Sequence, residues 1–216
     1  MTAPDVVHEP ALAELIDRAW ALVVPGQRRL LGIAGPPGAG KSTLAEAICE
    51  GLGPETAALV PMDGFHRSNA ELVRIGLRDR KGAPETFDAA GYAAMLARVR
   101  ASFGEPVLVP AFDRDADAVV PDAIDVPAGV PLIVAEGNYL LLDEGPWADV
   151  RALLDDAWYL RADASRVPRL IARHVAHGKP PDAAREWVLR SDEANTARIA
   201  PSEARADLVI DGLPRA

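Results

Sequence analysis

The most informative stretch of the sequence is Gly35-Pro-Pro-Gly-Ala-Gly-Lys-Ser42, which matches the pattern G-x-x-x-x-G-K-[ST] at every position. Glycines let such a loop curl so that successive backbone N–H groups point inward at phosphate oxygens. A short apolar run, 30–34, enters the loop as a buried strand would. A helical pattern, 41–50, leaves it with the positive end of the helix dipole toward the loop. The stretch therefore predicts a phosphate-binding loop (P-loop) for a nucleotide.

Three side chains of this loop have specific expected tasks. Lys41 can reach the β- and γ-phosphates, the Ser42 hydroxyl can bind Mg²⁺, and Thr43 is expected at the α-phosphate. The predicted cofactors are accordingly ATP and Mg²⁺. The predicted nucleotide-binding residues are Gly35, Pro36, Pro37, Gly38, Ala39, Gly40, Lys41, Ser42 and Thr43.

The sequence excludes two other nucleotide-binding classes. Gly38-Ala-Gly40 is followed by Lys-Ser-Thr with no third glycine, so a dinucleotide-binding fingerprint is absent. The chain has only three lysines, Lys41, Lys81 and Lys179, and none of them follows an Asn. The Asn-Lys-x-Asp motif that binds guanine is therefore missing, which argues against a GTPase.

Strand and helix patterns alternate along the rest of the chain, which predicts an α/β fold. We expect one domain over 1–216 with the P-loop NTPase fold: a five-stranded parallel sheet sandwiched by helices, with a helical lid at about 165–181. Residues 68–86 are expected to be irregular, and 113–127 to form a hairpin-like excursion. The expected strands are 30–34, 57–61, 107–109, 132–135, 157–160 and 208–210, and the expected helices are 10–23, 41–50, 88–102, 165–177 and 182–197.

The composition of the 216 residues bounds the protein's class. The formal net charge of −9 argues against a nucleic-acid partner. No apolar run approaches the ~20 residues of a membrane span, and no signal-peptide pattern opens the chain. The single cysteine, Cys49, excludes an internal disulfide framework. We expect a soluble, cytoplasmic protein without a membrane partner, as a monomer or homodimer.

Two carboxylates follow apolar strands and are candidates for chemistry. Asp63, in Pro61-Met-Asp-Gly-Phe-His66, is placed at the carboxyl end of a strand, on the same rim as the loop. There it can accept the proton of an attacking alcohol as a general base. Glu136, in Leu132-Ile-Val-Ala-Glu-Gly137, ends another strand and is the candidate partner of Ser42 on Mg²⁺.

The segment after residue 160 carries cations suited to a lid. Arg166, Arg169, Arg173 and His177 fall on one helix face, and Ser165 is expected to cap that helix. Pro168 restricts the first turn, which makes Arg169 and Arg173 the better candidates for clamping phosphate. A solvated face paired with Asp and Glu is the alternative. A stretch at 178–181 is suited to act as a hinge.

Several motifs together resemble the P-loop kinase family that contains phosphoribulokinase, uridine kinase and bacterial pantothenate kinase. They are Met62-Asp-Gly-Phe-His66, Lys81-Gly-Ala-Pro-Glu-Thr-Phe-Asp88, Pro110-Ala-Phe-Asp-Arg114, Glu136-Gly-Asn-Tyr139 and the stretch 195–207. With Arg173-His-Val-Ala-His-Gly178, the chain is most similar to a small bacterial subgroup described as nucleoside/nucleotide kinase-like or fructose-transport kinase-like.

The resemblance implies roles for individual residues and also shows departures from named members. It implies that Asp63 is the substrate-contacting base. The candidates for binding the acceptor are Asp63, His66, Arg67, Asp88, Arg114 and Tyr139. Pantothenate kinases carry a longer N-terminal region and phosphoribulokinases carry additional C-terminal structure, neither of which we expect here. Uridine kinases have Asp-x-Phe-Tyr where this chain has Asp63-Gly-Phe-His66.

The predicted function is ATP-dependent phosphorylation of an alcohol group on a small metabolite, with a sugar as one candidate acceptor. In this reaction Lys41, Arg169 and Arg173 stabilise the transferring phosphoryl group while Asp63 draws the proton. A pantothenate- or uridine-type kinase is the alternative within enzymes. A nucleotide-dependent regulatory switch or ATPase is the alternative of another class, and it has no need of a base aimed at an organic acceptor.

Overall fold

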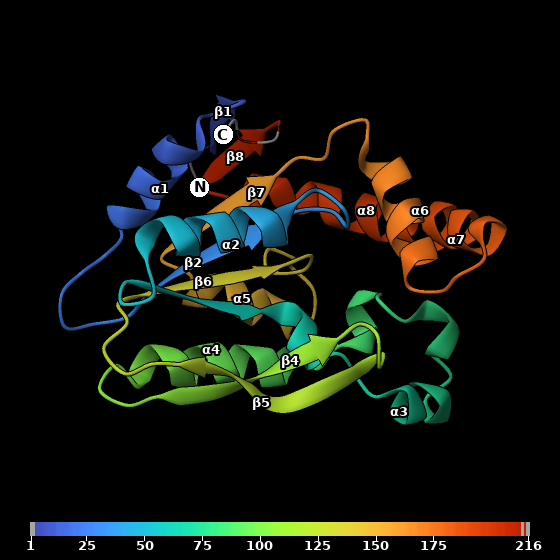
Figure 1. Ribbon diagram of the computed structural model, residues 1–216, viewed down its shortest axis with the longest axis horizontal. Coiled ribbons are helices and arrows are strands. Elements are labelled where there is room, and N and C mark those ends of the chain that lie inside the picture. Colours follow the sequence, from blue (N-terminus) through green and yellow to red (C-terminus); the bar gives the residue numbers. More distant parts are fainter. Residues whose placement is uncertain (1–2, 213, 215–216) are drawn as a thin grey trace.

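A central parallel sheet of six strands organises the computed structural model, which describes residues 3–212 and 214 (Figure 1). In spatial order the strands are β1 (Asp5–His8), β8 (Leu208–Asp211), β7 (Asp156–Leu160), β2 (Arg29–Ala34), β6 (Leu132–Gly137) and β3 (Ala57–Pro61). The strands β2 and β6 are buried along almost their whole length, as their continuous apolar runs predict. The α/β P-loop fold is thus confirmed.

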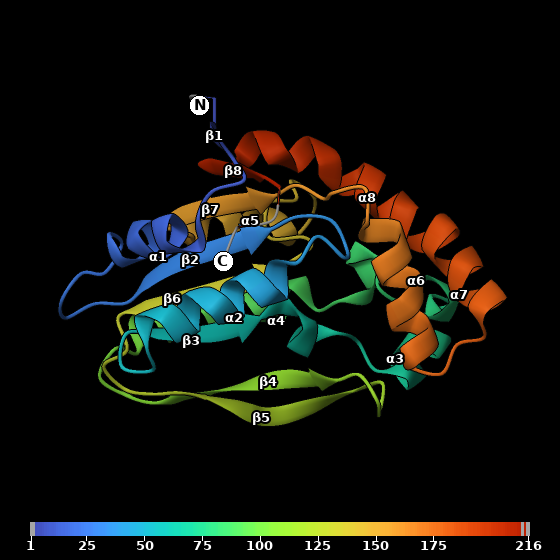
Figure 2. The same cartoon turned by 45° about the horizontal axis from the view of Figure 1, so that its top comes forward.

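The prediction of five strands in the parallel sheet is wrong, because the sheet has six. The additional strand is β1, which pairs in parallel with β8 from Asp5↔Leu208 to His8↔Asp211 at one edge of the sheet. Its four residues are mostly exposed, so they carry no apolar pattern that would identify a strand. The predicted strand at 107–109 lies outside this sheet. It begins β4 (Val107–Asp113), which forms a separate antiparallel hairpin with β5 (Ala118–Val126), shown apart from the sheet in Figure 2.

Two hydrophobic clusters cover the two faces of the sheet. Helices α1 (Leu12–Trp20) and α2 (Lys41–Leu52) pack on one face, and α4 (Ala89–Ala101) and α5 (Trp147–Leu153) pack on the other (Figure 1). Asp88 caps α4 as predicted, because its side chain accepts a hydrogen bond from the Gly91 backbone N–H at 3.0 Å. No helix in the described part of the chain is long and apolar enough to cross a membrane.

The segment after β7, which contains the predicted lid at about 165–181 and is called the lid below, consists of several short helical pieces. They are α6 (Arg166–Ala176), α7 (Pro181–Trp187), a π-helical segment (Val188–Asp192) and α8 (Glu193–Ile199). Ser165 precedes α6 but makes no side-chain cap, because its hydroxyl hydrogen-bonds to Asp163 instead. The segment predicted as irregular contains a short helix, α3 (Asn69–Arg74), which is capped by the Ser68 side chain. The 3₁₀ segments are Met62–Phe65, Arg78–Arg80, Pro84–Thr86 and Ala200–Arg205.

Candidate active site

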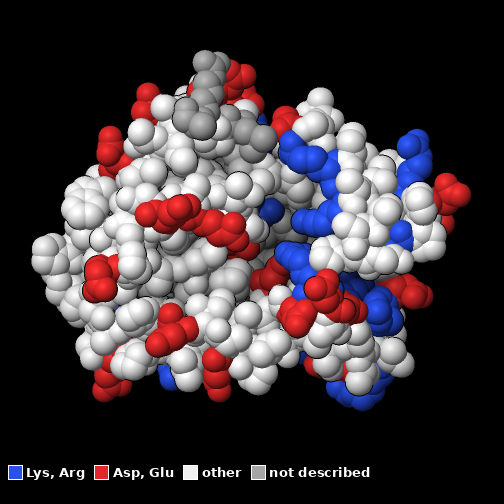
Figure 3. All heavy atoms as spheres, viewed as in Figure 1, with Lys and Arg blue, Asp and Glu red and all other residues white. Residues whose placement is uncertain are grey.

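A pocket of about 760 Å³ opens at the carboxyl edge of the sheet, enclosed by the P-loop, the tip of the β4–β5 hairpin and the lid. In the space-filling view, Lys and Arg side chains gather around this hollow although the chain is acidic (Figure 3). All three lysines of the chain and three of its four histidines line the pocket. The predicted site residues that the structure brings to its wall are Pro37, Gly38, Gly40, Lys41, Ser42, Thr43, Asp63, His66, Arg114, Glu136, Arg169 and Arg173.

The P-loop runs from β2 to the first turn of α2. Gly38 and Gly40 have φ angles of 76° and 101°, in the left-handed region that a residue with a Cβ rarely adopts. A Cβ at Gly38 would also lie 2.7 Å from Cγ of Leu170, so the glycine allows α6 of the lid to approach the loop. Backbone curvature and lid contact therefore depend on the same glycine.

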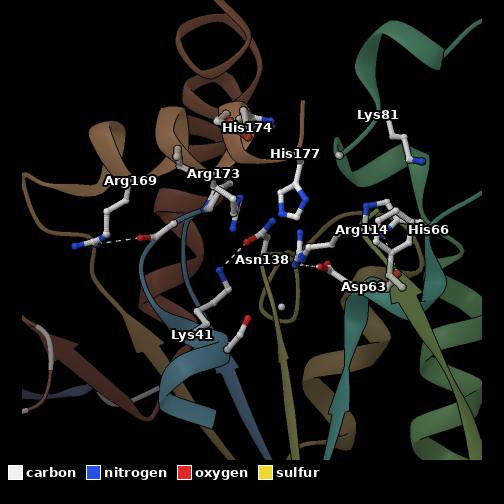
Figure 4. A pocket seen from close by; sticks show the side chains of 18 of the residues that line it. Lys41, Asp63, His66, Lys81, Arg114, Asn138, Arg169, Arg173, His174 and His177 are labelled. Carbon is white, nitrogen blue, oxygen red and sulfur yellow. Dashed lines mark hydrogen bonds and ion pairs between the residues drawn. The ribbon is translucent and has the colours of Figure 1, made fainter. Parts of the chain in front are cut away.

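Lys41, the first residue of α2, is buried and held in place by two hydrogen bonds. Its ammonium donates to the Pro36 carbonyl at 3.0 Å and to Oδ1 of Asn138 at 2.7 Å (Figure 4). Burial lowers the pKa of Lys41 to about 8, and the nearby carboxylate of Glu136 opposes that shift. Because an ammonium has three N–H donors, one remains for a phosphate oxygen.

Glu136 lies near the end of β6 and is 6% exposed. Burial and, to a smaller extent, the charge of Asp63 raise the pKa of its carboxyl group to about 7, against the opposing effects of Lys41 and of a hydrogen bond from Ser42. A buried carboxylate beside a hydroxyl offers the hard oxygen ligands that Mg²⁺ prefers. No cluster of three or more His, Cys, Asp or Glu able to hold a metal occurs among the described residues. Such a limited protein donor set fits Mg²⁺, which usually binds one or two carboxylates together with substrate phosphates and water.

Asp63 follows β3, the strand next to β6, and the register Pro61↔Glu136 sets the two acids side by side at the edge. Its Oδ2 accepts a hydrogen bond from Nη2 of Arg114 at 2.6 Å, and the carboxylate is 24% exposed. Arg114 reaches it from the hairpin tip. A Cβ at Gly64 would lie 2.2 Å from the Pro110 carbonyl oxygen, so this glycine allows β4 to approach Asp63.

His66 packs between two aromatic rings, with centroids 4.1 Å from Phe87 and 4.3 Å from Phe112. Its Nδ1 lies 2.7 Å from the carbonyl oxygen of Asp63, which can only accept, so Nδ1 carries the proton. Burial lowers the pKa of His66, which favours the neutral ring. Neutral His66 then presents Nε2 as a hydrogen-bond acceptor.

The structure separates the two arginines that the sequence proposes as phosphate clamps. Arg169 is engaged by the protein, because its guanidinium donates to Oδ2 of Asp163 and to the Gly38 carbonyl of the P-loop, both at 3.0 Å. Within the described part of the chain, Arg173 has no ion-pair partner, and its side chain points into the pocket (Figure 4). Arg173 is therefore the cation available to a ligand, while Arg169 fastens the lid to the loop.

Six predicted residues do not line the pocket. Three of them, Gly35, Pro36 and Ala39, belong to the P-loop but do not line the wall of the pocket. Arg67 pairs with Glu71, Asp88 caps α4, and buried Tyr139 donates its hydroxyl to the Gly82 carbonyl. The latter three are engaged by these structural partners.

Other residues on the pocket wall are absent from the predicted set. Asn138 contacts Lys41, and Lys81 pairs with Asp117 of the hairpin tip at 2.7 Å. Lys179 lies over the Trp187 ring, 4.7 Å from its centroid. Because the chain has only three lysines, the sequence could have marked Lys81 and Lys179 as candidate site residues. Trp187 carries no such signal, since only the packing of the lid brings it to the pocket.

The sequence profile of the Phosphoribulokinase / Uridine kinase family matches residues 30–216. The chain belongs to this family. It is 36% identical over 211 residues to the uncharacterized protein YggC of Escherichia coli strain K12, covering 95% of this chain and 86% of that protein. It is 35% identical over 222 residues to a Schizosaccharomyces pombe protein with the provisional name uridine kinase C227.14, covering 98% and 93%.

The solved structures agree with this membership. A crystal structure from Silicibacter sp. TM1040, of a protein provisionally named a fructose transport system kinase, superposes with a TM-score of 0.81 at 37% identity. The superposition covers 92% of this chain and 98% of that one. The predicted resemblance is confirmed, and this member of the phosphoribulokinase/uridine kinase family is an ATP-dependent kinase of small molecules.

Proposed function

We propose that the protein transfers the γ-phosphoryl group of ATP, bound with Mg²⁺, to an alcohol group of a small hydroxyl-rich metabolite. The observation that carries the proposal is the placement of three groups at one sheet edge. Lys41 follows β2, Glu136 ends β6 and Asp63 follows β3, and all three line one pocket. A regulatory switch has no use for a carboxylate beyond the metal-binding acid, whereas a kinase needs one for its acceptor.

The donor end of the pocket is built from the P-loop and the lid. The backbone of 35–43 surrounds the phosphates, and Lys41 contacts the β- and γ-phosphates. Ser42 and Glu136 hold Mg²⁺, which neutralises charge on the β- and γ-phosphate oxygens when bound. Arg173, which has no ion-pair partner among the described residues, stabilises the negative charge of the phosphoryl group in transfer.

The acceptor end supplies the base. Arg114 holds Oδ2 of Asp63, which leaves Oδ1 free to take the proton of the acceptor hydroxyl. The acceptor oxygen forms a bond to the γ-phosphorus as the bond from that phosphorus to the β-phosphate bridging oxygen breaks. ADP leaves with that oxygen, the product is a phosphate monoester, and the proton passes from Asp63 to water.

A sugar or other polyol fits the acceptor end best. The wall there combines hydrogen-bond acceptors (Asp63 and neutral His66) with a donor (Arg114). Such a mixture matches a ligand that has several hydroxyl groups, each of which can donate and accept a hydrogen bond. The provisional name of the Silicibacter relative points the same way, while the names of other relatives keep uridine- and pantothenate-type acceptors as alternatives.

The proposed setting is the cytoplasm, where ATP is available, with the protein acting as a monomer or homodimer. The net charge of −9 disfavours a nucleic-acid partner, and the Lys and Arg side chains that line the pocket suit the phosphates of ATP.

A panel of acceptors tests the proposed function. ADP release from Mg·ATP is measured with sugars, polyols, pantothenate and nucleosides, with Lys41→Ala as the inactive control. We expect at least one polyhydroxylated acceptor to raise ADP release well above the rate with no acceptor, and Lys41→Ala to abolish the increase. If no alcohol in the panel raises ADP release while ATP is hydrolysed steadily throughout, the switch or ATPase alternative would be favoured.

A further inference from the structure

Asn138 follows the β6 strand and is oriented by the P-loop lysine. The ammonium of Lys41 can only donate, so the atom 2.7 Å from it must be the carboxamide oxygen Oδ1. The amide nitrogen Nδ2 therefore lies on the other side of the group. Figure 4 shows Asn138 between Lys41 and the lid residues Arg173 and His177, with its nitrogen turned away from Lys41 into the pocket.

The two N–H groups of Nδ2 have no acceptor among the residues that the structure describes. This differs from the chain's other asparagines, since Nδ2 of Asn69 donates to Asp117 at 2.9 Å and Nδ2 of Asn195 donates to the Gly82 carbonyl at 3.3 Å. A half-buried amide whose oxygen is fixed and whose nitrogen faces an open pocket is prepared to donate to a ligand.

The position of Asn138 indicates which ligand atom it meets. Lys41 of a P-loop contacts the β- and γ-phosphates, and Asn138 touches that same ammonium. On its other side lie Arg173 and the acceptor base Asp63, so Asn138 stands between donor and acceptor ends (Figure 4). The backbone N–H groups of a P-loop bind the α- and β-phosphates. The γ-phosphate is therefore the phosphate that would lie next to Asn138.

We propose that Nδ2 of Asn138 donates a hydrogen bond to an oxygen of the γ-phosphate, so that Asn138 distinguishes ATP from ADP. The proposal rests on the proposed function, because it requires ATP as the phosphoryl donor. A neutral amide suits this position. It adds a donor without adding charge beside Lys41 and Arg173, and its oxygen keeps Lys41 directed at the same phosphate.

The test compares the affinities of the protein for Mg·ADP and for a non-hydrolysable Mg·ATP analogue, measured by isothermal titration calorimetry without any acceptor. Asn138→Ala should weaken binding of the triphosphate about 10- to 100-fold, the range for one hydrogen bond to a charged group. Binding of ADP should change by no more than about twofold, because loop and Lys41 contacts to the β-phosphate remain. Affinity for ADP also reports whether Lys41 has been misplaced.

Two further variants complete the design. Asn138→Asp is nearly isosteric and keeps an oxygen for Lys41, but it replaces the donor by an anion, so the ratio of ADP to triphosphate affinity should rise further. Gln27→Glu makes the same change from amide to carboxylate at an exposed residue that does not line the pocket, and its ratio should match the native one. If Asn138→Ala fails to fold, the Asp variant carries the test.

An equal loss of affinity for both nucleotides in the Asn138 variants would make this residue a support for the loop and overturn the proposal. Unchanged affinities would overturn it too. These outcomes are independent of the acceptor. A protein that phosphorylates no alcohol but keeps the predicted affinity ratio would contradict the proposed function and leave the role of Asn138 intact.

Discussion

Replacing Asp63 by Asn separates the role of a base from that of a metal ligand. The two side chains are nearly the same size, and the carboxamide oxygen of Asn can still accept the hydrogen bond that Arg114 donates at 2.6 Å. That orientation turns the amide NH₂ toward the acceptor hydroxyl, where the native carboxylate presents Oδ1. The variant therefore has a donor where the reaction needs a proton acceptor.

The magnitude follows from the chemistry of proton removal and from the exposure of the ion pair. General-base catalysis contributes about 10²–10⁴-fold, which raises the barrier by about 3–5 kcal/mol when it is lost. The Asp63–Arg114 pair is 24% and 46% exposed, so its loss should change the free energy of unfolding by no more than about 1 kcal/mol. We expect kcat with the acceptor to fall by about 10²–10⁴-fold in a protein that remains folded.

Acceptor-dependent ADP release and Mg·ATP affinity are measured on Asp63→Asn and, as the matched comparison, on Glu136→Gln. Asp63→Asn should bind Mg·ATP nearly as the native protein does. Glu136→Gln should bind it clearly less well, because it lacks the buried carboxylate that we assign to Mg²⁺. Near-native turnover in Asp63→Asn would refute the assignment of the base. So would a defect that consists only of lost ATP binding, since Asp63 would then be a metal or structural residue.

Two further predictions concern arginines. Arg173→Ala should lower kcat by about 10³-fold or more, with a smaller change in the KM for ATP, because its charge is needed in transfer. Arg169→Ala, which loses contacts to the protein itself, should lower kcat less. Equal effects of the two variants in steady-state kinetics would contradict these separate roles. Arg28 is 2% exposed and donates to backbone carbonyls of 99, 102, 105, 127 and 130. Arg28→Met should therefore lower the free energy of unfolding, measured in urea, by about 3 kcal/mol or more. Replacement of the exposed Arg190 by Met should change it by less than about 0.5 kcal/mol. Similar urea midpoints for the two variants would disprove the structural role of Arg28.

The parts of the site that could be predicted are those in which local sequence determines position. The local order of strand, glycine loop and helix is enough to place Lys41 and Ser42. Asp63 comes two residues after β3 and Glu136 lies near the end of β6, and the carboxyl ends of neighbouring parallel strands meet at one edge. Strand alternation was enough to predict the α/β class, but not the pairing of the exposed β1.

The remaining parts depend on contacts between distant segments. Lys81 reaches the pocket because Asp117 of the hairpin tip holds it across 36 residues of chain. Arg169 and Arg173 are equivalent in helical pattern, and only the approach of α6 to Gly38 shows that one is engaged and the other free for a ligand. Asn138 belongs to the motif Glu136-Gly-Asn-Tyr139, but its contact with Lys41 spans 97 residues and exists only in the folded chain.

The central claim is that the γ-phosphoryl group goes to an alcohol, and ³¹P NMR of the reaction products tests it most directly. With the acceptor that stimulates ADP release most, we predict a new phosphate monoester resonance that grows in equal amount with ADP and is absent with Lys41→Ala. Formation of ADP and free phosphate in equal amounts, with no phosphate ester in the presence of the alcohol, would contradict the claim.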